Sequence, residues 1–72
     1  MKNASDQICK KLGKSIRLRR EKQKISQEKL AYGAELHRNY ISRLECGIAN
    51  PSLKVIFRIA CVLDVQLEDL FK

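Results

Sequence analysis

The sequence has few of the residues from which catalytic and metal sites are built. It contains no tryptophan, a single histidine (His37) and three cysteines (Cys9, Cys46 and Cys61), with no CxxC pair among them. This pattern indicates neither a zinc site nor a disulfide framework, so we expect reduced thiols, no metal and no cofactor. A chain of 72 residues can bury one small core and leaves little room for a deep catalytic pocket. We therefore do not expect an enzyme.

Long apolar runs are also missing. No stretch approaches the roughly 18 apolar residues of a membrane span, and residues 1–7 are polar, without the apolar core of a signal peptide. We expect a cytoplasmic protein without a membrane partner. The polar residues 1–7 are expected to form a flexible N-terminal arm, and residues 8–72 a single domain. Because no second domain follows, we expect no small-molecule ligand.

Acidic residues are scarce, since 15 Lys and Arg face only 8 Asp and Glu, for a net charge of +7. The excess is uneven: residues 10–24 hold eight basic residues and one acid, whereas residues 62–72 hold three acids and one lysine. A strongly basic domain indicates an anionic partner, with nucleic acid ahead of a membrane surface. Taken alone, the basic run favours phosphate contacts over the alternative of an ordinary solvated face.

Residues 27–45 have the pattern of two short helices around a turn. Ser26 is a good N-cap for the first helix, and Leu30, Ala31 and Ala34 provide its apolar positions. In the second helix, an advance of about 100° per residue places Ile41 and Leu44 on one face. The second helix is therefore expected to anchor through its apolar pair and to turn a polar face outward.

The outward face of the second helix carries Asn39, Ser42, Arg43 and Cys46, and Arg38 in its first turn points to the side of this face. An Arg can donate two hydrogen bonds to guanine, and an Asn can both donate to and accept from adenine, so such a face suits the edges of DNA bases. The alternative is that these are solvated polar residues on an amphipathic helix, as on most such faces. This helix alone does not decide between the two.

Three segments carry a family resemblance: IRLRREKQKISQEKLA (16–31), LHRNYISRLECG (36–47) and NPSLKVIFRIACVLDVQLEDLF (50–71). In this order and spacing, the chain from Leu12 to Phe71 resembles the phage-repressor and Cro family of helix-turn-helix proteins, also called the XRE family. The resemblance implies an all-α, compact five-helix, lambda-repressor-like domain with the third helix, about residues 37–46, in the DNA major groove. Two positions depart from the family pattern: Glu35 replaces the usual turn Gly, and His37 the usual Ser or Thr cap.

The expected helix boundaries follow from capping residues and apolar spacing. The first helix is expected from Ile8 to about Gln23, the second from Ser26 to about Ala34, the fourth from Leu53 to Leu63 and the last from about Gln66 to Phe71. Gly13 is expected to permit close helix packing. In the fourth helix, Leu53 is counted among the core positions.

The resemblance also implies roles for individual residues. Arg38, Asn39, Ser42 and Arg43 match the base-reading positions, and Arg20 and Glu45 match a structural ion pair between the first and third helices. Phosphate contacts are expected at positions that face the DNA backbone, namely Lys14, Arg17, Gln27, Tyr40, Asn50, Ser52 and Lys54. For Tyr40, a partly buried ring without a DNA role is an equal alternative. Apolar residues beyond the needs of the core predict a homodimer interface at Val55, Val62, Leu67 and Phe71. The alternative is that the apolar residues of the last two helices bury one another within a single chain.

Two function classes are compatible with these features. The first is a sequence-specific transcriptional regulator that binds a palindromic site in double-stranded DNA as a homodimer, resembling the small controllers of restriction-modification loci. The second is a protein-interaction module, such as an antitoxin, that keeps the fold for partner capture. An adaptor would more often place apolar residues at Asn39, Ser42 and Arg43, so the sequence favours the regulator.

Overall fold

The computed structural model describes the backbone of residues 4–72 and the side chains of residues 6–72. The first helix, α1 (Ala4–Lys22), buries Leu12 and Ile16 on its inner face. It begins at Ala4 and not at Ile8, so residues 4–7 belong to the helix and not to the expected arm. Asp6 lies in the first turn, where a negative charge favours helix formation. The remainder of the expected arm, residues 1–3, lies outside the described residues.

Gly13 allows α1 to approach the third helix closely. A Cβ atom at this position would lie 2.2 Å from the carbonyl oxygen of Leu44 and 3.0 Å from that of Glu45. Both neighbours are backbone atoms that cannot rotate away, so any larger residue would separate the two helices. The expectation that Gly13 serves close packing is confirmed.

The second helix, α2 (Gln27–Gly33), starts where the sequence predicts. Ser26 is its N-cap, and the Ser26 side chain accepts a hydrogen bond from the backbone N–H of Lys29 at 3.0 Å. Glu35 then adopts a left-handed conformation with φ of 58°, the conformation for which the family usually has Gly. The backbone N–H of Leu36 donates to the carbonyl of Ala31 at 2.8 Å, which closes the turn.

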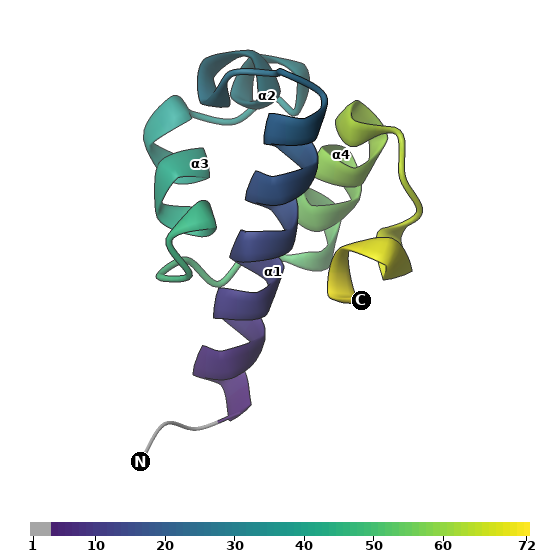
Figure 1. The fold of residues 1–72 in the computed structure, drawn as a ribbon. Helices are drawn as coiled ribbons and strands as arrows, with labels where there is room; N and C mark the ends of the chain where they lie inside the picture. Colours follow the sequence, from purple (N-terminus) through teal and green to yellow (C-terminus); the bar gives the residue numbers. More distant parts are fainter. Residues whose placement is uncertain (1–3) are drawn as a thin grey trace.

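The third helix, α3 (Arg38–Glu45), follows directly from this turn. His37 holds its N-cap position, but the His37 side chain makes no capping hydrogen bond. Gly47, with φ of 80°, follows the helix end, as expected for a terminating glycine. α2 and α3 pack closely on each other, and Figure 1 shows both at the same end of α1.

The fourth helix, α4 (Leu53–Leu63), has the predicted boundaries. Ser52 caps it by accepting a hydrogen bond from the backbone N–H of Val55 at 3.2 Å. Leu53, counted among the core positions from the sequence, is 67% exposed, so this expectation is wrong. The first turn of α4 presents Leu53 to solvent because Ile56, Ile59 and Ala60 already face the core.

The last element, η1 (Leu67–Phe71), is a 3₁₀ helix and not a fifth α-helix. A capping box supports its start, because the backbone N–H of Gln66 donates to the Asp69 carboxylate at 3.0 Å. Five residues are too few for more than about one helical turn, and the tighter 3₁₀ geometry is common in such short pieces. The expected order of five helical segments holds, with four α-helices in the described chain.

One apolar core joins all five elements. Its fully buried side chains come from every element, namely Ile16, Leu30, Ile41, Leu44, Ile59, Leu63 and Leu70. Two side-chain hydrogen bonds tie the end of α1 and the residue after it to the C-terminal half. Arg19 Nη2 in α1 donates to the Asp69 carbonyl at 2.9 Å, and Gln23 Nε2, just after α1, donates to the Leu63 carbonyl at 2.7 Å. Figure 1 shows α3 and η1 on opposite sides of α1. The predicted all-α class is confirmed.

Candidate nucleic-acid interface

The outward face of α3 is polar and accessible. Ile41 and Leu44 are fully buried, whereas Arg38, Asn39 and Arg43 are exposed. Ser42 is half-buried, so its hydroxyl reaches solvent only partly. Since the exposed residues recur along one side of the helix, two guanidinium groups and one amide can face a common surface. Such a set can donate to guanine and make paired hydrogen bonds with adenine.

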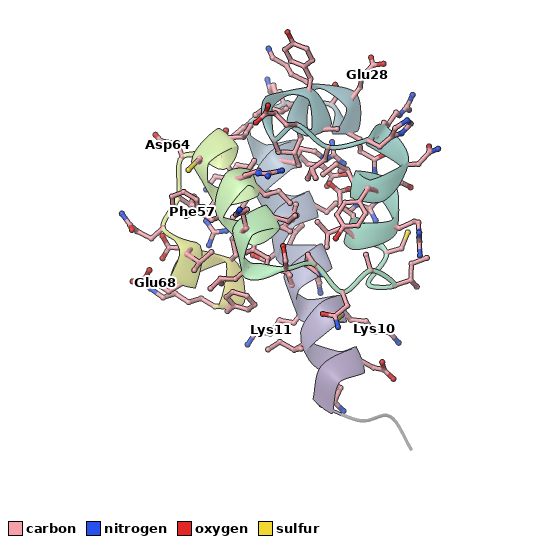
Figure 2. All side chains as sticks on the ribbon, turned by 180° about the vertical axis from the view of Figure 1, so that it is seen from behind. Lys10, Lys11, Glu28, Phe57, Asp64 and Glu68 are labelled. Atoms are coloured by element: carbon pink, nitrogen blue, oxygen red, sulfur yellow. The ribbon has the colours of Figure 1, made fainter. Side chains whose placement is uncertain are left out.

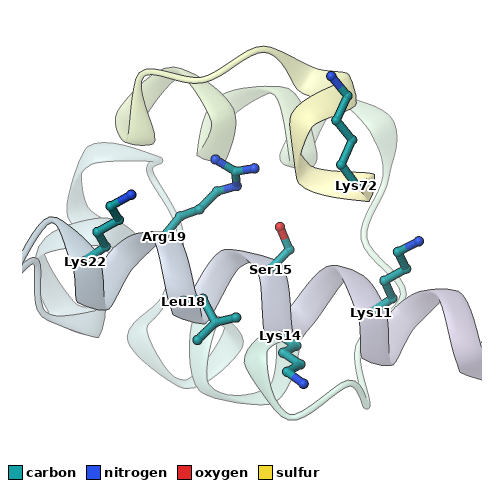
Figure 3. Close-up of a pocket in the computed structure, with 7 residues that line it drawn as sticks. All are labelled: Lys11, Lys14, Ser15, Leu18, Arg19, Lys22 and Lys72. Atoms are coloured by element: carbon teal, nitrogen blue, oxygen red, sulfur yellow. The ribbon is translucent and has the colours of Figure 1, made fainter.

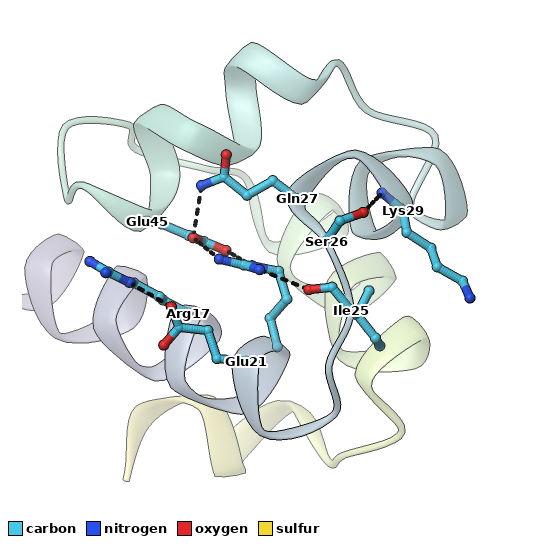
Figure 4. A network of polar contacts seen from close by, with 8 residues as sticks. Arg17, Glu21, Ile25, Ser26, Gln27, Lys29 and Glu45 are labelled. Carbon is cyan, nitrogen blue, oxygen red and sulfur yellow. Dashed lines mark hydrogen bonds and ion pairs between the residues drawn. The ribbon is translucent and has the colours of Figure 1, made fainter.

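A buried ion pair holds the end of α3 to α1. Arg20 Nε lies 2.6 Å from Glu45 Oε2, and Arg20 Nη2 donates to Glu45 Oε1 at 3.0 Å, which makes the contact bidentate (Figure 4). The side chains are only 12% and 3% exposed. Arg20 Nη1 also donates to the carbonyl of Ile25 at 2.7 Å, so the guanidinium bridges α1, α3 and the turn before α2.

This environment favours the charged guanidinium. The hydrogen bond to Glu45 raises the pKa of Arg20 above its ordinary value, and this effect outweighs the lowering by burial. No buried polar side-chain atom among the described residues lacks a hydrogen-bond partner. The Arg20 and Glu45 pair therefore has the geometry of a structural contact and is turned away from the outward face of α3.

Gln27 is a third member of this network. Its Nε2 donates to Glu45 Oε1 at 3.0 Å, so the first residue of α2 is tied to the last residue of α3 (Figure 4). Phosphate binding was the only role predicted for Gln27 from the sequence, so this contact was not foreseen. No local pattern signals it, because the partner lies 18 residues further along the chain. The second amide hydrogen of Gln27 is still available to another acceptor.

The other residues expected to contact phosphate lie in two regions. Asn50 and Ser52 are exposed in the segment that joins α3 to α4, and Lys54 is exposed in the first turn of α4. Ser52 retains its hydroxyl proton because it only accepts in its capping bond. Arg17 is exposed on α1 and pairs with Glu21 at 3.3 Å.

Two further phosphate candidates have different surroundings. Tyr40 is half-buried and packs against the core, as the alternative reading of this residue expects. Lys14 is exposed on α1 and lines a groove that this helix forms with the C-terminal segment.

The residues expected at a dimer interface are mostly occupied within the chain. Val55, Val62, Leu67 and Phe71 are half-buried and pack against the core. The methyl groups of Val62 also lie against α2, because a Cβ at Gly33 would be 3.1 Å from one of them. These four side chains therefore have less free apolar surface than their sequence positions indicated.

The large apolar side chains that α4 leaves uncovered are Leu53 and Phe57, which are 67% and 58% exposed. They lie four residues apart and thus share one side of the helix; Figure 2 shows Phe57 projecting from α4. Neither residue was predicted at an interface from the sequence. The signal that could have identified them is their four-residue spacing, which places both on a side of α4 that the buried residues do not occupy.

The cysteines of the described part of the chain are not paired with one another. Cys46 and Cys61 are exposed and Cys9 is half-buried, all as free thiols. No group of three potential metal ligands comes together among residues 4–72. None of the described helices is both long enough and apolar enough to cross a membrane.

A short helix, a tight turn and a second helix with an exposed polar face define a helix-turn-helix protein. The helix-turn-helix family model HTH_3 matches residues 16–70, and the chain belongs to this family of transcriptional regulators. The control protein C.BamHI of Bacillus amyloliquefaciens is 48% identical over 59 residues, which cover 81% of this chain and 73% of that protein.

Solved structures agree with this assignment. The restriction-modification controller protein C.AhdI from Aeromonas hydrophila superposes with a TM-score of 0.85 at 36% identity, covering 88% of this chain and 96% of that one. The biofilm regulator SinR, solved in complex with DNA, gives a TM-score of 0.80 at 29% identity, covering 85% of this chain and 98% of that one.

Proposed function

We propose that the chain is a cytoplasmic, sequence-specific transcriptional regulator that binds a palindromic operator in double-stranded DNA as a homodimer. The observation that carries the proposal is the outward face of α3, where Arg38, Asn39 and Arg43 are exposed while Ile41 and Leu44 are fully buried. An α-helix fits the major groove of B-DNA, where each base pair presents a distinct set of donors and acceptors. Arg43 and Asn39 are the residues we propose to read bases, with Arg38 and Ser42 at the edge of the contact.

Precise reading requires that α3 be held rigidly. The backbone contact at Gly13 fixes the separation of α1 and α3, and the Arg20, Glu45 and Gln27 network fixes the end of α3 against α1 and α2. Each correct bidentate base contact contributes about 1–3 kcal/mol of discrimination, which a loosely held helix would lose.

Phosphate contacts are proposed to position α3 in the groove without selecting sequence. Lys54, Asn50 and Ser52 offer an ammonium, an amide and a hydroxyl from the segment before and within the start of α4. Gln27 can use its second amide hydrogen, since the first is donated to Glu45. Lys14, Arg17 and Tyr40 complete the proposed set.

The proposed dimer uses the apolar surface of α4 and η1. Leu53 and Phe57 provide the exposed side chains, and the half-buried Val55, Val62, Leu67 and Phe71 are proposed at its edge. A two-fold axis through such a patch would place two copies of α3 about one helical turn of DNA apart, roughly 34–36 Å. The identity with C.BamHI supports a role as controller of a restriction-modification locus.

Selection of bound sites from random DNA duplexes, followed by sedimentation of the selected complex, tests the proposal. We expect a palindrome bound by two chains. Phe57→Lys should weaken dimerisation and operator binding without changing the melting temperature, because the side chain is 58% exposed. Binding of random and selected duplexes with equal affinity would reject sequence-specific regulation and favour a protein-interaction module. A single chain on the selected site would reject the dimer.

A further inference from the structure

The side of α1 that faces away from α3 carries a concentration of positive charge of which only Lys14 has a proposed role. A groove of about 440 Å³ lies there between α1 and the C-terminal segment. Its charged and apolar lining residues, which we call the basic groove, are Lys11, Lys14, Leu18, Arg19, Lys22 and Lys72 (Figure 3). Because α3 and η1 lie on opposite sides of α1, the basic groove is separate from the proposed base-reading face.

Most of this charge is not neutralised within the chain. Among the described residues, Lys11, Lys14 and Lys22 form no ion pair, and Arg19 donates to a backbone carbonyl at 2.9 Å. Only Lys72 meets a carboxylate, that of Asp69, at 3.1 Å. The groove therefore presents a net positive surface that attracts an acidic partner.

An apolar side chain lies within this charge. Leu18 is 55% exposed and borders the groove beside the lysines of α1 (Figure 3). A partner that carries both acidic and apolar groups would cover Leu18 and pair with the lysines together. Single-stranded nucleic acid sites instead combine positive charge with aromatic stacking residues, and none of the residues that line this groove is aromatic. This combination favours a polypeptide over nucleic acid.

The spacing of the groove residues fits a helical partner. Lys11, Lys14, Leu18 and Lys22 recur every three or four residues, so they follow one side of α1 over about 16 Å. A second helix laid along this side could present acidic and leucine side chains with the same repeat. We propose that the basic groove docks an acidic amphipathic helical segment of another protein, on a surface of which only Lys14 is shared with the proposed phosphate contacts.

The probe for this proposal is a fluorescent peptide of about 14 residues with glutamates flanking leucines on one helical face. A scrambled peptide of the same composition reports the effect of charge alone. The full chain is compared with Lys11→Glu/Lys22→Glu, with Leu18→Ser, and with the matched control Lys24→Glu/Lys29→Glu, which makes the same charge change outside the groove. Circular dichroism melting verifies that each variant is folded.

We expect the peptide to bind the parent and the control similarly, and the groove variant about tenfold more weakly, since two exposed ion pairs become repulsions. Leu18→Ser should also weaken binding of the peptide, and the scrambled peptide should bind poorly. Equal binding of both peptides, or equal losses in groove and control variants, would overturn the proposal.

Two further measurements exclude other occupants. If a random DNA duplex lost affinity for the groove variant but not for the control, the occupant would be nucleic acid and the proposal would be wrong. If the groove variant sedimented as a smaller species than the parent, the occupant would be a second copy of this chain, which also overturns it. Operator binding, proposed to depend on α3, should persist in Lys11→Glu/Lys22→Glu. Failure of the docking proposal is therefore distinguishable from failure of the proposed regulatory function.

Discussion

Glu45→Ala should destabilise the fold and thereby operator binding. Glu45 is the point at which Arg20 and Gln27 converge, with hydrogen bonds of 2.6, 3.0 and 3.0 Å. Removing the carboxylate leaves a guanidinium that is only 12% exposed without its charge partner, and it also deprives the Gln27 amide of an acceptor. The Ile25 carbonyl remains as a partner for Arg20 but carries no compensating charge.

The expected magnitude follows from the burial. Breaking a buried ion pair by removing one member costs about 3–5 kcal/mol. Because Arg20 keeps some contact with water and a backbone acceptor, we expect the lower end, about 3 kcal/mol. For a domain of this size, each kcal/mol lowers the melting temperature by about 4–8 °C, so a decrease of roughly 12–24 °C is expected. Total stability is on the order of 4–11 kcal/mol, so the variant should still fold at low temperature.

Urea unfolding of the parent and of Glu45→Ala measures this difference. The matched control is Glu21→Ala, which removes the Arg17 pair at 3.3 Å, whose side chains are 61% and 50% exposed. Surface pairs of this kind contribute about 0.5 kcal/mol or less. A loss of less than about 1 kcal/mol for Glu45→Ala, or equal losses in both variants, would refute a structural role for the buried pair.

The stabilisation of the fold by Arg20 depends on pH in a direction that follows from its pKa. The hydrogen bond to Glu45 raises the pKa of Arg20 above its ordinary value. A raised folded-state pKa contributes stability that is fully present below the unfolded pKa and is lost only as pH rises through the folded value. The contribution of Arg20 ionisation should therefore be constant across neutral pH, and a titration of it between pH 6 and 9 would contradict the assignment.

Three further predictions concern other parts of the molecule. Gly13→Ala should destabilise the fold by about 1–3 kcal/mol in urea unfolding, because the added Cβ would lie 2.2 Å from the Leu44 carbonyl oxygen; an unchanged midpoint would show that α1 and α3 can separate freely. Asp69→Asn should lower the melting temperature at neutral pH and match the parent at low pH. Hydrogen bonding from Lys72 lowers the pKa of Asp69 below 3.8, so the stabilisation by its carboxylate is lost as pH falls through the folded-state pKa. A difference in melting temperature that stays constant from pH 2 to 7 would contradict this. Lys54→Ala should weaken the binding of selected and random duplexes alike and reduce the slope of log K against log salt by about 1. An unchanged slope would remove Lys54 from the phosphate contacts.

Local sequence signals located most of the helices. Ser26 and Ser52 cap α2 and α4 as expected, and Gly47 follows the end of α3, because each acts through hydrogen bonds or dihedral angles within a few residues. The start of α1 was misplaced because residues 4–7 have no apolar period to extend the pattern of Ile8, Leu12 and Ile16. Polar residues in a first helical turn resemble an unstructured arm in sequence.

The details that depend on tertiary contacts could not be read from local pattern. Gln27 joins the ion-pair network only because the fold brings α2 beside the end of α3. In α4, apolar residues occupy more than one side of the helix, so periodicity alone could not show that Val62 packs on Gly33 while Leu53 and Phe57 stay exposed. Which apolar face is covered depends on the neighbouring elements.

The most direct test of base reading by α3 is the affinity of the parent, Arg43→Ala, Asn39→Ala and Lys54→Ala for a set of duplexes. The set comprises the selected operator and every single base-pair substitution within one half-site. Arg43→Ala and Asn39→Ala should each lose about 1–3 kcal/mol of discrimination at one base pair and keep the preferences at the other base pairs. Lys54→Ala should instead weaken binding to all duplexes uniformly. If Arg43→Ala and Asn39→Ala retained the base preferences of the parent at every position, α3 would not be the reading helix.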